Sequence, residues 1–250
     1  MTEILVGFLI AAGVGLTGVG AGSLLAPILM LFFKVPPAEA VGTSLAFSAV
    51  TKLAVAPVYV IRKQIHYATF LRLCCGGVPG VLCGFFLMDL LDAKHHRNAL
   101  FVIIGALVAS MAFYNLIRTV RRSAHHRSSR NRSAWLPWIA AGIGAEVGLS
   151  SAGAGALGSV ALLNLTPLTT AEVVGTDVMF GLVLSLVGGG FHLSVGHLQS
   201  AILTHLLVGG VVGALIGANL LAVLPSRPLR VALSAWLTCM GVQLCWQALG

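Results

Sequence analysis

The sequence predicts an all-helical protein that crosses a membrane several times. Of its 250 residues, 58% are hydrophobic and only 9% are charged, and the mean hydropathy is +0.97. A soluble domain carries roughly 25% charged residues, so this chain cannot cover itself with a wetted surface. Several apolar runs reach the ~20 residues that a helix needs to cross a bilayer. These runs are continuous rather than alternating, which excludes a transmembrane β-barrel.

The apolar residues fall into eight segments, which we expect to form membrane helices. The first segment has Glu3 and no Lys or Arg before its apolar run, whereas a signal peptide begins with basic residues. We therefore expect a retained span, and a multi-pass protein of the cell (inner) membrane. The segments are 4–33, 38–61, 67–90, 98–118, 135–165, 171–195, 198–222 and 229–248.

A polar, basic stretch, RTVRRSAHHRSSRNRS at 118–133, separates the fourth segment from the fifth. We interpret it as a cytoplasmic linker between two transmembrane halves, 1–117 and 134–250. Ten of the fifteen Lys and Arg residues fall at 62–63, 118–132 and 227–230. Basic loops mark the cytoplasmic side of a membrane protein, so the net charge of +8 does not indicate nucleic-acid binding. The five cysteines lie in apolar runs without metal-site spacing, and we expect neither a metal nor a cofactor.

The two halves are copies of one unit. The residues AEAVGTSLAF at 38–47 recur as AEVVGTDVMF at 171–180, 133 positions later. At this offset, residues 15–84 align without a gap with 148–217 and share 23 identities, many of them glycines. Apolar bias alone would match Leu with Leu, but not glycines, a Glu and a Thr. Internal repeats are a common plan of secondary transporters, so the pattern favours a duplicated carrier.

The first segment of each half carries a glycine cluster, GVGLTGVGAGS at 13–23 and GIGAEVGLSSAGAGALG at 142–158. An unbroken helix over 4–33 would be ~45 Å long, too long for a hydrocarbon core of ~30 Å. Glycine clusters interrupt helices, so each half is predicted to contain a broken helix. Discontinuous helices at corresponding places of two halves point to a transporter's binding site.

The orientation of the halves depends on whether the broken segment crosses the membrane or returns. If it returns, the halves are inverted and all ten loop charges share one side. If it crosses, the halves are parallel with eight full spans, and the basic residues at 227–230 move to the other side. We favour inverted repeats, because Val195 and Gly196 of the second copy replace the basic pair at 62–63, as opposite orientations require.

The helix after each break begins with helix-starting residues. Prolines precede Glu39 in the first copy, and Thr169 with Glu172 fits a capping box in the second. Acidic residues favour the first turn of a helix. Both glutamates are therefore expected to stabilise helix N-termini.

Several motifs follow one another in a fixed order: GVGAGSLLAP at 18–27, PPAEAVGTSLAF at 36–47, a basic turn, and GGVPGVLCG at 76–84. In this order they resemble the sulfite exporter TauE/SafE family, and the resemblance covers both halves. It implies a plasma-membrane carrier that exports small sulfur-containing anions such as sulfite or a sulfonate. Two departures leave the anion open: the glycine run is GAG rather than three glycines, and VGTD replaces the more usual VGTS in the second copy.

A compact oxyanion needs hydrogen-bond donors that replace its water. The N-terminal ends of broken helices present free N–H groups and the positive end of the helix dipole, and glycine lets the backbone come close. We therefore expect the anion to bind at the midplane between two facing donor sets. Alternatively, these glycines only let helices pack closely. The first set is Gly20, Ala21, Gly22 and Ser23, the second is Ser151, Gly153, Ala154 and Gly155, and the hydroxyls of Thr43, Ser44 and Thr176 add contacts.

Ionisable residues inside the segments are further candidates. Lys52 lies deep in its segment, where a cation is costly and by default functional; it attracts the anion or pairs with an acid, unless its ammonium snorkels to the surface. Asp177 stands where the first copy has Ser44. An acid beside an anion is unfavourable unless it is paired or protonated, so we hypothesise that Asp177 couples transport to protons, with Glu146 or Lys52. The alternative is a structural hydrogen bond to a neighbouring helix.

The alternatives to an exporter are an intramembrane enzyme, a passive anion channel and a carrier for another small organic anion. An intramembrane enzyme would need a Ser–His pair, but no motif fixes a His near Ser23, and duplication of the whole unit favours transport. We therefore expect no enzyme. A passive anion channel would share the anion-lining residues, and a carrier for another small organic anion stays open. Glycine-rich faces would allow a homodimer.

Overall fold

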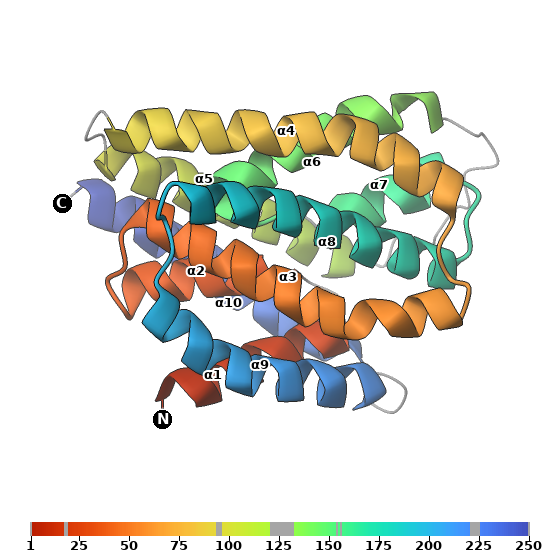
Figure 1. The fold of residues 1–250 in the computed structure, drawn as a ribbon, viewed down its shortest axis with the longest axis horizontal. Helices are drawn as coiled ribbons and strands as arrows, with labels where there is room; N and C mark the ends of the chain where they lie inside the picture. Colours follow the sequence, from red (N-terminus) through yellow and green to blue (C-terminus); the bar gives the residue numbers. More distant parts are fainter. Residues whose placement is uncertain are drawn as a thin grey trace.

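The protein is a bundle of helices whose long members lie side by side (Figure 1). The computed structural model describes residues 2–17, 20–93, 97–120, 133–153, 155, 157–220 and 226–249, and every element in these ranges is helical, which confirms the predicted class. The first half contributes α1 (Thr2–Thr17), α2 (Ala21–Leu31), α3 (Pro37–Ile61), α4 (Tyr67–Ala93) and α5 (Arg97–Val120). After a 3-10 turn at Ser133–Trp135, the second half contributes α6 (Leu136–Ser150), α7 (Leu157–Leu165), α8 (Thr170–Ser194), α9 (Ser200–Leu220) and α10 (Ser226–Leu249).

Both expected helix breaks are present. The first separates α1 from α2, and the second separates α6 from α7. In the second break Ser151 has φ 59° and Gly153 has φ 91°, and an α-helix cannot continue through such residues. With 11 residues, α2 is about 17 Å long, roughly half of what a hydrocarbon core requires.

Four helices are long and apolar enough to cross a membrane, by length and composition, among the residues that the structure describes. Shorter apolar helices account for Glu3–Gly13, Ala21–Leu31 and Ser200–Ile216. Most of the predicted linker, residues 121–132, lies outside the described part, and α5 carries the first half to Val120. The four long helices are Pro37–Ile61, Tyr67–Asp92, Asn98–Ile117 and Thr170–Ser194.

The equivalent helices α3 and α8 cross each other in opposite directions. The backbone N–H of Gln199 donates to Thr43 Oγ1 at 3.0 Å, and the backbone N–H of His66 donates to Thr176 Oγ1 at 3.0 Å. The two hydrogen bonds are equivalent, because adding 133 to His66 gives Gln199 and subtracting 133 from Thr176 gives Thr43. The start of α3 therefore lies against the end of α8, and the start of α8 against the end of α3.

The first helix of each half packs on the fourth helix of the other half. A Cβ on Gly209 or Gly213 of α9 would collide with the backbone of α1, at Ile4 and Phe8 respectively. The equivalent glycines of α4, Gly76 and Gly80, lie in the same way against the backbone of α6 at Pro137 and Ala141. Small residues at these crossings let the backbones approach, as in other membrane helix pairs. The halves are thus interlocked by contacts that recur at the repeat offset.

The broken segment of the first half returns toward the end from which it came. In Figure 1, α1 runs from left to right, α2 runs back to the left, and α3 runs to the right again. The ends of α3 and α5 and the start of α10, which border the basic stretches, lie together at the right of this view. We therefore propose the inverted arrangement of repeats, with the right-hand end of Figure 1 at the cytoplasm.

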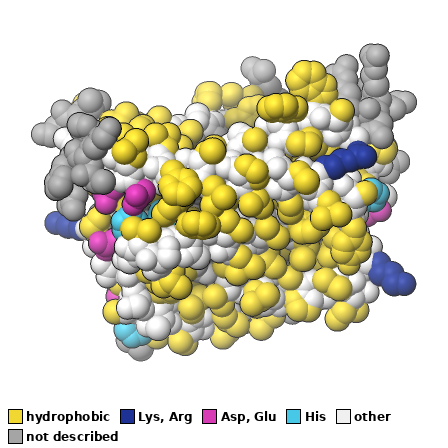
Figure 2. Space-filling view, turned by 45° about the horizontal axis from the view of Figure 1, so that its top comes forward, with side chains coloured by type: hydrophobic (Ala, Val, Ile, Leu, Met, Phe, Trp, Pro, Cys, Tyr) yellow, Lys and Arg dark blue, Asp and Glu magenta, His cyan; other side chains and the backbone are white. Residues whose placement is uncertain are grey.

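The lipid-facing character of the surface is visible in Figure 2. Hydrophobic side chains cover the middle of the face shown, while basic, acidic and histidine side chains lie toward its two ends. Large apolar side chains such as Ile61, Trp138 and Trp246 are more than three-quarters exposed. Such a surface requires lipid rather than water as its solvent.

The two glutamates expected at helix starts are held there. The Thr169 side chain accepts a hydrogen bond from the Glu172 N–H at 3.3 Å, and Glu172 Oε2 accepts one from the Thr169 N–H at 2.8 Å. This is the predicted capping box. At the start of α3, Glu39 accepts a hydrogen bond from the side chain of Gln199, which ties the start of α3 to the start of α9.

The inverted arrangement is tested by labelling from the two sides of the membrane. Tyr67 and Ser200 are equivalent residues that begin α4 and α9, and both are exposed. In a background without the native cysteines, we expect Tyr67→Cys to react with an impermeant maleimide only in inside-out vesicles. Ser200→Cys should react only in intact cells. Labelling of both from the same side would require parallel repeats.

Candidate functional site

The two helix breaks meet inside the bundle. A Cβ on Gly22 of α2 would collide with the side chain and carbonyl of Ser151, which ends α6. The N-cap of α2 is Gly20, which makes no side-chain capping hydrogen bond. Residues 20–23 are all buried, and the Ser23 hydroxyl donates to the Gly20 carbonyl at 2.6 Å. The first turn of α2 therefore presents backbone N–H groups and a positive dipole end to a buried site without a side-chain cap.

Two buried hydroxyl groups, one of them at the α6–α7 break, have no hydrogen-bond partner within the described ranges. They are Ser151 Oγ, beside Gly22, and Ser44 Oγ on α3, which is 0% exposed. An unpaired buried hydroxyl costs about 1–3 kcal/mol relative to a paired one. Each of these hydroxyls can donate one hydrogen bond to a ligand or a water molecule.

A polar stripe leads from Ser44 along α3. Ser48 and Lys52 follow at four-residue spacing, which places all three on one side of the helix. Lys52 Nζ donates to Ser185 Oγ of α8 at 3.5 Å, and the Ser185 hydroxyl donates to Ser48 Oγ at 3.3 Å. Lys52 and Ser185 are equivalent residues, so this polar contact lies at the centre of the crossing of α3 and α8.

Asp177 lies at the N-terminus of α7. It is 3% exposed, and its Oδ2 accepts a hydrogen bond from Ser159 Oγ at 2.5 Å. The backbone of Gly155 and of Ser159 lies near this carboxylate, and Lys52 attracts it electrostatically. Oδ1 lies where a Cβ on Gly158 would be and has no partner among the described side chains and backbone atoms. The hydrogen bond to a neighbouring helix that was the structural alternative for Asp177 is thus present.

The other predicted site residues have the following positions. The Thr43 and Thr176 hydroxyls accept the backbone hydrogen bonds that join the two halves. The Glu146 carboxylate lies 3.1 Å from where a Cβ of Gly153 would be, beside the α6–α7 connection. Ala154 lies outside the described residues, and Ala21 is buried in the first turn of α2.

Four residues at these contacts were not among the site residues predicted from the sequence: Ser48, Ser159, Ser185 and Gly158. The repeat offset held a signal for two of them. Gly158 and Ser159 stand where the first copy has Leu25 and Ala26, next to the helix that carries the Ser44-to-Asp177 difference. Ser48 and Ser185 become visible only when the antiparallel crossing of α3 and α8 is known.

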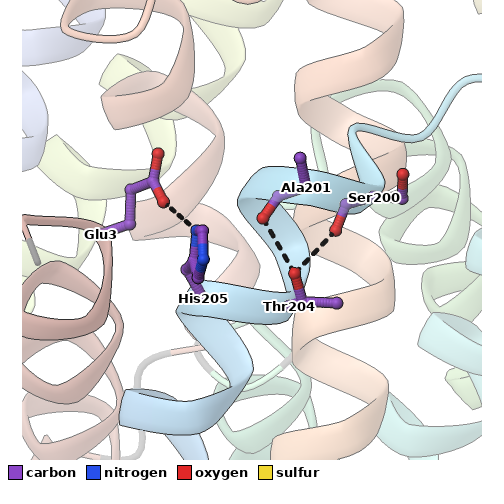
Figure 3. Close-up of polar contacts among 5 residues, drawn as sticks. All are labelled: Glu3, Ser200, Ala201, Thr204 and His205. Carbon is purple, nitrogen blue, oxygen red and sulfur yellow. Dashed lines mark hydrogen bonds and ion pairs between the residues drawn. The ribbon is translucent and has the colours of Figure 1, made fainter.

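A second polar contact, at the end of the bundle, has a structural role. Glu3 of α1 and His205 of α9 approach to 2.5 Å (Figure 3), and the neighbouring Thr204 hydroxyl donates to the carbonyl of Ala201 at 2.9 Å. The side chain of His205 is 58% exposed. At the equivalent position of the first half, Arg72 donates to Ser133 Oγ at 2.7 Å. Both contacts tie the fourth helix of one half to the beginning of the first helix of the other.

The sequence is similar to those of membrane transporters. The family model "Sulfite exporter TauE/SafE" matches residues 3–244. The chain is similar to the probable membrane transporter protein YjnA of Bacillus subtilis, with 28% identity over 96% of this chain and 98% of the relative. It is also similar to the probable membrane transporter protein YdhB of the same organism, with 28% identity over 93% of this chain and 95% of the relative. No solved structure shows a significant match.

The contact between the two breaks predicts a different cost for two Gly→Ala substitutions. Gly22→Ala inserts a methyl group against the Ser151 backbone, and overpacking of this kind costs about 1–3 kcal/mol. We expect a lowered melting temperature of the purified protein in detergent. Gly142→Ala in α6, where an added Cβ meets nothing within 4 Å, is the matched control and should melt like the wild type. Equal melting temperatures for the two variants would show that the breaks do not touch.

Proposed function

Because the chain belongs to the sulfite exporter TauE/SafE family, we propose that it exports sulfite or a small organosulfonate, with the anion bound at the N-terminus of α2. The chain is a multi-pass membrane transporter and not an enzyme, as its family and its named relatives indicate. The identity of the anion, its binding site and its coupling to protons are the proposed part.

One observation supports the site above the others: the first turn of α2 is buried, and among the described residues no side chain caps it. In lipid, unpaired backbone groups are tolerated only where protein or a water-filled cavity satisfies them. A compact oxyanion satisfies several N–H groups at once, and the helix dipole stabilises its charge. Ser44 and Ser151 then donate their free hydroxyl protons to the remaining oxygen atoms. The donors replace the water that the anion loses on leaving solution.

The polar stripe on α3 supports coupling to protons. Lys52 attracts Asp177, and hydrogen bonds join Lys52 through Ser185 to Ser48, one helical turn from Ser44. The Asp177 carboxylate and the substrate therefore compete for the same cation, the Lys52 ammonium group. When a proton neutralises Asp177, Lys52 interacts with the substrate alone, so that protonation and anion binding favour each other. Glu146 is the second candidate for a proton carrier, at the α6–α7 connection.

Flux measurements in proteoliposomes test the function. We expect saturable transport of labelled sulfite or of a small labelled sulfonate, and a response of the initial rate to an imposed proton gradient. Flux that rises linearly with concentration and ignores the gradient would indicate a passive anion channel. Absence of flux from folded protein would indicate a carrier for another anion.

The coupling role of Asp177 predicts a change in pH dependence. A sulfonate stays ionised across neutral pH, so its transport reports on the protein rather than on the substrate. We expect wild-type transport of a sulfonate to rise as the pH falls, because protonation of Asp177 frees Lys52. Asp177→Asn should flatten this profile, whereas Asp89→Asn on α4, outside the site, should preserve it. An unchanged profile in Asp177→Asn would contradict the coupling role.

A further inference from the structure

The two helix N-termini at the breaks differ: α7 already holds a carboxylate, whereas within the described part of the chain α2 holds none. Asp177 Oδ2 accepts the hydrogen bond of Ser159, a residue in the first turn of α7. The backbone of Gly155 and of Ser159 faces the same carboxylate. A carboxylate that accepts several donors at a helix N-terminus has the surroundings that a free oxyanion would have there.

Three coordinated differences between the repeats create room and a donor for this carboxylate. Gly158 stands in place of Leu25, and any Cβ there would collide with Asp177. Ser159 stands in place of Ala26 and supplies the shortest hydrogen bond to the carboxylate. Asp177 itself stands in place of Ser44, whose hydroxyl is buried and unpaired within the described part of the chain. A random exchange of Ser for Asp would have produced neither the space nor the donor.

The positions of the charged side chains fit a carboxylate at α7 and a substrate anion at α2. Lys52, at the centre of the crossing between α3 and α8, is attracted by Asp177. With the carboxylate at α7, the buried cation has an acidic neighbour when no substrate is bound. A second free anion at α7 would meet the negative charge of Asp177 and the space that its side chain fills.

We propose that Asp177 is a tethered anion that fills the second of two related anion sites, so that each chain binds one substrate anion, at α2. This inference rests on the proposed function, since it takes the α2 site as the one that the substrate occupies. The residue thereby sets the stoichiometry of binding and the asymmetry of an otherwise duplicated carrier.

Exchange of the three residues between repeats tests the proposal. The variant Asp177→Ser, Gly158→Leu, Ser159→Ala gives the second half the residues of the first. The variant Ser44→Asp, Leu25→Gly, Ala26→Ser gives the first half the residues of the second. The probe is sodium sulfite, titrated calorimetrically into purified protein in low-chloride buffer. We expect one site per chain in the wild type, two in the first variant and none in the second.

Two single substitutions keep the test decisive where a triple variant does not fold. Asp177→Ser removes the charge and opens space beside Gly158, and we expect it to bind a second sulfite. Asp177→Asn removes the charge but keeps the shape, and it should retain one site. The melting temperature of each variant without sulfite identifies those that are folded.

The outcomes separate this inference from the proposed function. One site in the wild type and still one in folded Asp177→Ser would overturn the tethered anion and leave the α2 site standing. No binding to the wild type, but one site in Asp177→Ser, would support the tethered anion and contradict sulfite as the substrate at α2. Sulfite binding to the folded Ser44→Asp triple variant with wild-type affinity would contradict both the substrate site at α2 and the role of Asp177 as a tethered anion.

Discussion

A helix that begins halfway through a bilayer exposes its first backbone N–H groups where no lipid can accept them. In this protein that constraint arises twice, at the starts of α2 and α7. At α7 the carboxylate of Asp177 lies at the exposed end and accepts a hydrogen bond from Ser159 in its first turn. At α2 the N-cap is Gly20, and no side chain among the described residues caps that end. The proposed substrate, its position and the difference between the halves all follow from how these two ends are satisfied.

The remainder of the fold brings the two helix breaks together, where Gly22 meets Ser151. The antiparallel crossing of α3 and α8 places Ser44 and Asp177 at opposite ends of one polar stripe, with Lys52 and Ser185 between them. Glycines at the α1–α9 and α4–α6 crossings let the short helices lie close to the opposite half. A site made from both halves is what an alternating carrier requires, because relative movement of the halves then opens it to either side.

The sequence allowed the helical membrane class, the two breaks and the Thr169–Glu172 capping box to be predicted, because each depends on local composition or on short spacing. It did not reveal which residues meet between the halves. The repeat offset pairs Gly22 with Gly155, whereas the contact in the structure joins Gly22 to Ser151. Thr43 and Thr176 were expected to bind the substrate, but their hydroxyls accept hydrogen bonds from backbone of the other half. Equivalence between copies says which residues correspond, and packing decides which residues touch.

Anomalous diffraction from crystals that contain selenite would locate the bound anion. Selenite has the shape and charge of sulfite, and selenium gives an anomalous signal that marks its place in a crystal. We expect one selenium peak per chain, within hydrogen-bonding distance of the first turn of α2 and of the Ser44 and Ser151 hydroxyls. A peak at the N-terminus of α7, or one distant from both helix breaks, would contradict it.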